Sequence, residues 1–161
     1  MILVSSCLGG IECRYNGSHA ASEKIRKLVD EKKAVMACPE LLGGFSTPRE
    51  PAEIIGGTGE DVLNGTAKIV TASGEDVTEL YMEGAAKTLA YAKEINASAV
   101  ILKENSPSCG SGFIYNGTFS GKKITNGTFS GKKITGSGVT AALLKQAGYR
   151  VISENELDDI L

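Results

Sequence analysis

The chain has 161 residues and a net charge of −2, a size that suits one domain with its own core. Acidic and basic residues are interspersed, which argues against a membrane-binding or non-specific nucleic-acid-binding surface. No run approaches the roughly 20 apolar residues that span a bilayer. We therefore expect a single domain over residues 1–161, located in the cytoplasm. In that reducing compartment, four cysteines are more often ligands, nucleophiles or buried thiols than disulfides.

Short apolar runs predict buried strands at residues 2–4, 34–37, 99–103 and 150–152. Helical patterns separate them: apolar residues recur at helical spacing after Ser22, after Asp76 and over 139–147. A short terminal helix is expected after Ser153. This alternation predicts an α/β, three-layer, Rossmann-like domain whose small parallel sheet has the strand order 2-1-3-4.

The middle of the chain is less regular. Pro and Gly are frequent over residues 48–65, which predicts irregular structure, and 67–70 is expected to form a small hairpin strand. Later, the ten residues NGTFSGKKIT at 116–125 are repeated without change at 126–135. Two explanations of the repeat stay open: a tandem duplication without a function, and an extended hairpin that acts as a lid. The lid is possible because lengthening a surface loop costs little closure entropy. We expect an exposed loop in which one copy packs and the other extends.

Three cysteines follow predicted strands. Cys7 comes after the first strand and Cys38 after the second, and Cys109 lies in a Pro/Gly loop beyond the third. Because the C-terminal ends of parallel strands share one edge of a sheet, we expect the three thiols to meet. Such a set favours an iron–sulfur cluster over zinc, since the sequence has no Cys-x-x-Cys pair and no histidine pair. Buried cysteines acting as small apolar side chains are the alternative.

Cys13 and His19 are treated separately. Cys13 lies six residues after Cys7 in a turn-rich stretch. Either it completes a closed four-cysteine cluster, which would favour a structural or electron-transfer role, or it is a free thiol outside the cluster. The free thiol is the favoured interpretation. His19, the only histidine, lies among polar residues and is expected to be solvated.

Four blocks resemble the domain-of-unknown-function family 523, whose characterised members are similar to bacterial thiouracil desulfurases. The blocks are MILVSSCLGGIECRYNG, ACPELLGGFSTPREPAEI, LKENSPSCGSGFIYNGTFSGKKI and GSGVTAALL. The resemblance implies an oxygen-sensitive [4Fe–4S] cluster held by Cys7, Cys38 and Cys109, with one iron open to the sulfur of a thiocarbonyl. The chain departs from the family pattern at Asn16 and Asn116, where aspartate is usual.

Polar residues near these cysteines are candidates for catalysis and substrate binding. Glu40 directly follows Cys38-Pro39 and suits proton transfer, and a salt bridge to Arg14 or Arg49 is the equal alternative. Ser108 is the second catalytic candidate, although turn capping also explains a serine there. Six residues are predicted to bind the substrate. Arg14 and Tyr15 could stack on or hydrogen-bond a planar base, and Ser106 offers a hydroxyl group. Gly136, Ser137 and Gly138 begin a helix, where free N–H groups could bind a carbonyl group or an anion.

The leading hypothesis is a cluster-dependent desulfurase that acts on a thiolated pyrimidine such as 2-thiouracil, as a free base or a nucleoside. A non-enzymatic iron–sulfur or metal-binding module for redox sensing or sulfur transfer is the second hypothesis. The third is a base- or nucleotide-binding domain whose cysteines are incidental. A visible spectrum of anaerobically purified protein separates the third from the first two, and hydrosulfide release separates those two.

Overall fold

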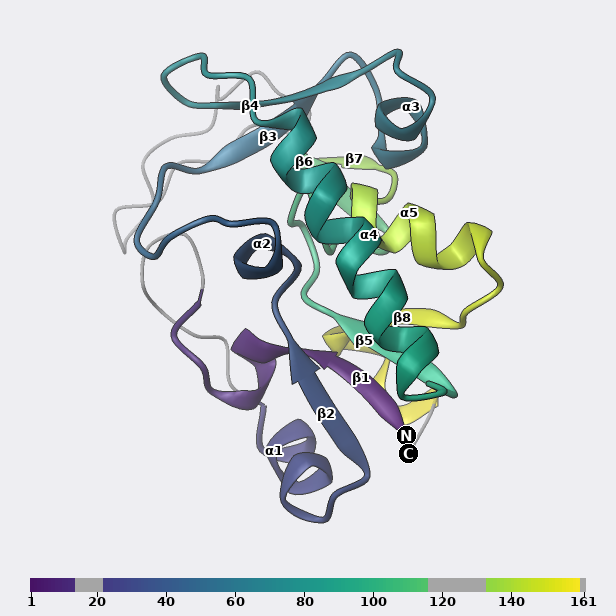
Figure 1. Ribbon diagram of the computed structural model, residues 1–161. Coiled ribbons are helices and arrows are strands. Elements are labelled where there is room, and N and C mark those ends of the chain that lie inside the picture. The colour runs from purple at the N-terminus through teal and green to yellow at the C-terminus, as the bar shows by residue number, and fades with distance from the viewer. Residues whose placement is uncertain (14–21, 116–132, 160–161) are drawn as a thin grey trace.

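The computed structural model describes residues 1–13, 22–115 and 133–159. A parallel sheet of four strands lies in the lower half of Figure 1. Its spatial order is β2-β1-β5-β8, which confirms the predicted order 2-1-3-4. The inner strand β1 pairs Leu3 with Val35 on one side and with Val100 on the other. The strand bounds are β1 (Ile2–Ser5), β2 (Ala34–Ala37), β5 (Ala99–Leu102) and β8 (Val151–Ser153).

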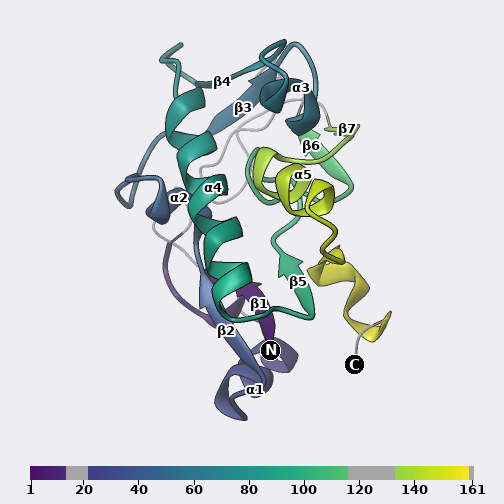
Figure 2. The same ribbon diagram turned by 45° about the vertical axis from the view of Figure 1, so that its right-hand side comes forward.

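Helices cover both faces of this sheet, as the three-layer prediction requires (Figures 1 and 2). Successive strand residues point to opposite faces. Val4 therefore packs in one buried cluster with Ile25 and Leu157, while Leu3 packs in another with Ala92 and Leu144. The covering elements are α1 (Glu23–Asp30) and the 3-10 helix η2 (Glu154–Asp159) on one face, and α4 (Thr78–Glu94) and α5 (Val139–Gln146) on the other.

A second, smaller sheet lies at the top of Figure 1. β3 (Ala52–Ile55) pairs antiparallel with β4 (Lys68–Thr71), and α3 (Gly59–Leu63) lies between them in the sequence. These elements and the first turns of α4 form a separate apolar cluster. Ile69 and Tyr81 belong to this cluster. The long helix α4 thus contributes to both the upper and the lower core.

The sequence prediction of irregular structure over 48–65 is wrong, because β3 and α3 lie there. The strand expected at 67–70 is present one residue later, but its partner precedes it in the chain. Gly56 has a φ of 90° and leads the chain out of β3, a backbone conformation that favours glycine. Thr58 then caps α3, and its N–H donates to the Asp61 carboxylate at 2.8 Å.

A short hairpin frames the repeated ten residues. β6 (Phe113–Tyr115) precedes the first copy, and β7 (Lys133–Thr135) is the end of the second copy. The two strands pair antiparallel, with Ile114 opposite Ile134. The prediction that one copy packs and the other extends falls on 116–132, which lie outside the described residues. Of the helices that the structure describes, none has the length and apolar character to cross a membrane.

Candidate functional site

The predicted ligands lie at the C-terminal ends of three neighbouring strands. Cys7 sits in the 3-10 helix η1 (Ser6–Gly9) directly after β1. Cys38 follows β2 and precedes α2 (Pro39–Leu42), and Cys109 lies in the loop after β5. All four cysteines of the chain are free thiols. The sheet topology therefore gathers these residues at one edge, as inferred from the strand pattern.

Cys13 belongs to the same group of thiols. Its side chain lies close enough to those of Cys7 and Cys38 for both to shift its pKa, and Cys38 likewise contributes to the shift of Cys109. The chain turns back at Gly10, whose φ is 101°. Cys13 is buried and lies beside two of the predicted ligands, and its place outside the cluster stays a prediction.

The pKa values of Cys13, Cys38 and Cys109 are all raised above that of a free thiol. A hydrogen bond with Cys38 lowers the pKa of Cys13, but the hydrogen bond with Cys7 and burial outweigh it and raise the pKa to about 11. The hydrogen bond with Cys13, followed by burial, raises the pKa of Cys38. Burial, followed by the charge of Glu40, raises that of Cys109. A cationic metal centre would reverse this trend, because coordination deprotonates a thiol.

A buried carboxylate holds the loop that carries Cys109. Glu104 follows β5, and its Oε1 accepts hydrogen bonds from the backbone N–H groups of Ser111 and Gly112 at 2.8 and 3.1 Å. Its Oε2 accepts a hydrogen bond from the Ser111 hydroxyl at 3.3 Å. One side chain thereby ties the start of the loop to its end. Sequence reasoning missed Glu104, because a single glutamate after a strand gives no signal of such bonds.

The start of α5 holds the same loop. Ser137 Oγ donates to the carbonyl oxygen of Ser111 at 3.1 Å, and a Cβ added at Gly138 would lie 2.6 Å from the backbone of Ser108. The glycine-rich segment was expected to bind substrate through free N–H groups, but the protein's own carbonyl oxygens accept from them. The hydrogen bonds run from Gly136 to Gly112 (2.9 Å), Gly138 to Gly110 (2.7 Å), Val139 to Pro107 (2.8 Å) and Thr140 to Ser108 (2.9 Å).

Glu40 points from the first turn of α2 toward the Cys109 loop. Its Oε2 accepts hydrogen bonds from Arg49 Nε and Nη2 at 2.9 and 2.6 Å and from the Tyr81 hydroxyl at 3.0 Å. Its Oε1 accepts one from Ser106 Oγ at 3.3 Å. The salt bridge to Arg49 that the sequence left open is therefore present. The carboxylate is also the closest in sequence to Cys38 and lies near Cys109.

The two candidate serines differ in accessibility. Ser108 is 1% exposed, and its hydroxyl pairs with Thr140 Oγ1 at 2.7 Å. Ser106 is only partly buried and accepts hydrogen bonds from the N–H groups of Ser108 and Cys109. Ser106 is therefore better placed than Ser108 to meet a substrate beside Glu40. The other predicted site residues, Arg14 and Tyr15, lie outside the described residues, as does His19.

The model of the 2-thiouracil desulfurase family matches residues 2–156. The chain belongs to this family. It is 93% identical over 161 residues to the uncharacterised protein YbbK of Bacillus subtilis (strain 168), and the match covers the whole of both chains. It is 39% identical to the solved structure of the [4Fe–4S]-dependent thiouracil desulfidase TudS (DUF523Vcz), with a TM-score of 0.81 over 99% of this chain and 93% of that one. The resemblance stated from the sequence is confirmed.

For a member of the thiouracil desulfurase family, the cysteine group fits an iron–sulfur cluster. Free thiols at separate strand ends provide the thiolates that such clusters take. Among the described residues, no three His, Cys, Asp or Glu side chains converge on a single metal ion.

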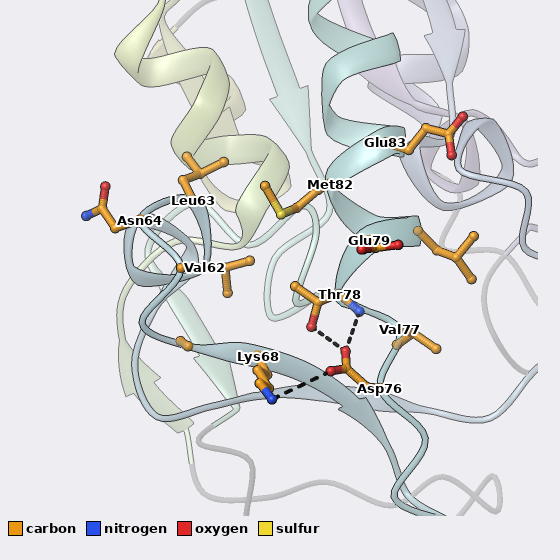
Figure 3. Close-up of a pocket in the computed structure, with 13 residues that line it drawn as sticks. Val62, Leu63, Asn64, Lys68, Asp76, Val77, Thr78, Glu79, Met82 and Glu83 are labelled. Atoms are coloured by element: carbon orange, nitrogen blue, oxygen red, sulfur yellow. Dashed lines mark hydrogen bonds and ion pairs between the residues drawn. The ribbon is translucent and has the colours of Figure 1, made fainter.

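An open groove elsewhere on the protein has a volume of about 750 Å³. It lies between α3, β4 and the first turns of α4, where Val62 and Met82 supply apolar walls (Figure 3). Lys68 and Asp76 line its lower edge and form an ion pair at 4.0 Å. The groove contains none of the cysteines and none of the predicted site residues, so the cysteine group remains the candidate site.

Proposed function

We propose that this protein is an iron–sulfur-dependent desulfurase that replaces the sulfur of a thiolated pyrimidine, such as 2-thiouracil, with oxygen. The observation that carries the proposal is that Cys7, Cys38 and Cys109 follow the C-terminal ends of three neighbouring strands, and that Glu40 bonds to the loop that holds Cys109. Membership of the family and the likeness to a [4Fe–4S]-dependent thiouracil desulfidase support the same conclusion. The substrate is a small molecule, a free base or a nucleoside.

Cys7, Cys38 and Cys109 would hold a [4Fe–4S] cluster. When bound, the cluster supplies an iron without a protein ligand, which acts as a Lewis acid toward the thiocarbonyl sulfur. These three cysteines come from three different strand ends, so they can surround the cluster from separate directions. Cys13 remains a free thiol next to Cys7 and Cys38 in this proposal.

The reaction is a hydrolysis in which a thiocarbonyl and water give a carbonyl and hydrogen sulfide, with no net oxidation or reduction. Glu40 takes the proton from the water that adds to the carbon and returns it to the departing sulfur. Its Oε1 accepts a hydrogen bond from Ser106 Oγ, and in this proposal Ser106 turns its hydroxyl from Glu40 to the pyrimidine when substrate binds. Ser108 supports this arrangement through Thr140 and the adjacent Cys109. Arg14 and Tyr15 stay the proposed contacts for the ring.

The test uses protein reconstituted with iron and sulfide without oxygen. We expect a brown chromophore and equal amounts of uracil and hydrosulfide from 2-thiouracil, with neither product from the iron-free protein. A chromophore without hydrosulfide would favour a non-enzymatic iron–sulfur module. Protein that takes up no iron and has no visible absorption would favour a base-binding domain with incidental cysteines.

A further inference from the structure

The two oxygens of the Glu40 carboxylate have very different surroundings. Three donors reach Oε2, two from the Arg49 guanidinium and one from the Tyr81 hydroxyl, at 2.6 to 3.0 Å. From the described residues, Oε1 accepts one longer bond, 3.3 Å, from Ser106. The Glu40 and Arg49 side chains are only 14% and 8% exposed, so water screens this pair little. The carboxylate is therefore fixed in rotation, with Oε1 toward the Cys109 loop.

We propose that Arg49 and Tyr81 are positioning residues that fix Glu40 so that Oε1, and not Oε2, exchanges the proton at the substrate. The inference rests on the proposed desulfurase function and adds the residues that orient its acid–base group. Because Oε2 already accepts three hydrogen bonds from strong donors, it has little capacity left for a further proton or water. Oε1 has that capacity, and it faces Ser106 and the loop that carries Cys109.

Both donors are themselves held in place by an aromatic side chain. The Tyr81 ring is 3% exposed and packs on the Phe45 ring with centroids 4.8 Å apart. The Arg49 guanidinium lies 5.8 Å from the centroid of the same ring. Burial, followed by the charge of Glu40, raises the pKa of Tyr81 well above its usual range, so its hydroxyl stays a donor at working pH. The donors are thus preorganised, as orientation of a catalytic group requires.

Arg49 has a second contact that Tyr81 lacks. Its Nη1 donates to the carbonyl oxygen of Cys13 at 3.1 Å, which connects Glu40 to the cysteine segment. Its remaining bonds, to Ser46 and Thr47, are local. Loss of Tyr81's hydroxyl should therefore affect proton transfer but not retention of the cluster. Loss of the Arg49 guanidinium should affect both proton transfer and retention of the cluster.

Tyr81→Phe keeps the ring and removes one donor to Glu40. In the cluster-loaded enzyme we expect kcat to fall about tenfold or more with KM nearly unchanged, because orientation and not binding is lost. Tyr91→Phe, the same change on the same helix, is the matched control and should have wild-type kcat. The spectrum and iron content should be those of wild type in both variants. Wild-type kcat in Tyr81→Phe would overturn the inference.

A double-mutant cycle asks whether Tyr81 acts through Glu40. Glu40→Gln alone should lower kcat by roughly a hundredfold, the scale of losing a general acid–base. Adding Tyr81→Phe to it should change kcat little further, since there is no proton left to position. If the two losses multiply, Tyr81 does not act through Glu40 and the inference is wrong.

Arg49→Lys keeps the charge but loses the two-pronged contact with Oε2. We expect a lower kcat and also faster loss of visible absorption when an iron chelator is added, whereas Tyr81→Phe should lose its cluster at the wild-type rate. Equal rates in Arg49→Lys and wild type would remove the proposed link to the cysteine segment. If the cluster-loaded wild-type enzyme releases no hydrosulfide, the proposed function is wrong. If wild type and the variants are equally active, only the inference about Arg49 and Tyr81 is wrong.

Discussion

The group formed by Cys7, Cys13, Cys38 and Cys109 is held by different interactions on its two sides. On the side of Cys109, a buried carboxylate and the start of α5 make hydrogen bonds to the backbone of one loop. On the other side, Cys7 and Cys13 belong to an apolar cluster with Leu8 and Ile25, and their backbone bonds are local turns. The Arg49 bond to the Cys13 carbonyl oxygen is the exception.

This difference indicates how a site that binds a cluster can exist before the cluster arrives. A loop fixed by polar contacts presents its ligand in one orientation, as the outer contacts of a metal site commonly do. Apolar packing is less directional, so the segment of Cys7 and Cys13 can adjust its thiols more readily. The Cys109 side should therefore fix the geometry, and the Cys7 side should adapt to it.

The largest effects are expected from the ligands themselves. Cys38→Ala or Cys109→Ala should remove nearly all of the visible absorption and bound iron after anaerobic reconstitution, because a cluster with two protein ligands is weakly held. Cys13→Ala is the matched control, because it removes the same sulfur atom from the more adaptable Cys7 side. This variant should keep most of the visible absorption and of the bound iron. Absorption and iron content decide the result. Equal loss from Cys13→Ala and Cys38→Ala would mean that four cysteines bind the cluster.

The next effect tests the polar side. Glu104→Gln replaces a buried carboxylate that accepts several hydrogen bonds with a neutral amide that has one acceptor oxygen instead of two. We expect the free energy of unfolding of the iron-free protein to fall by about 3 kcal/mol, measured in urea. The exposed Glu94→Gln on α4 should change it by less than about 0.5 kcal/mol. If both variants are as stable as wild type, hydrogen bonds to Glu104 do not hold the Cys109 loop.

Much of the fold could be predicted because apolar runs and helical periodicity are local properties. The four parallel strands and α1, α4 and α5 follow from them. β3 and α3 could not be predicted, since they are short and flanked by Pro and Gly. They form because Ile54 and Val62 are buried in an apolar cluster with residues of α4 and α5, which are distant in the sequence.

The site divides in the same way. The position of Cys7, Cys38 and Cys109 at one edge of the sheet follows from the order of the parallel strands, so the sequence could predict it. The glycine-rich start of α5 was correctly recognised as offering N–H groups, but the acceptors proved to be carbonyl oxygens of the protein itself. Glu104 and Tyr81 could not be found, because their roles depend on where a polar side chain points. Tyr81 reaches Glu40 from 41 positions further along the chain.

A smaller effect with a defined pH dependence is expected at Tyr81, which joins α4 to the cysteine site. The folded protein raises the pKa of this phenol above the usual value near 10, so folding favours its protonated form. Wild type should be more stable than Tyr81→Phe by about 2 kcal/mol at pH 7 to 9, the scale of a hydrogen bond to a charged group. The difference should shrink as pH rises above about 10, because the unfolded phenol then ionises.

Urea unfolding of the two iron-free proteins measures this difference. Ionisation of the cysteines affects both proteins alike, so the comparison isolates Tyr81. A difference in stability that stays constant from neutral pH to pH 11 would mean that the phenol is not held protonated in the folded protein.

The smallest effect is expected from removing one copy of the repeat. Deletion of 126–135 joins Thr125 to Gly136 and puts the same Lys-Ile-Thr sequence next to β6, so the β6–β7 hairpin can form again. The connection between the two strands becomes less than half as long, which should raise the free energy of unfolding by about 0.6 kcal/mol. Glu104 closes the Cys109 loop at Gly112, before the hairpin begins, so cluster content should not change. A marked loss of stability or of bound iron after deletion would show that the second copy supports the fixed side of the cysteine group.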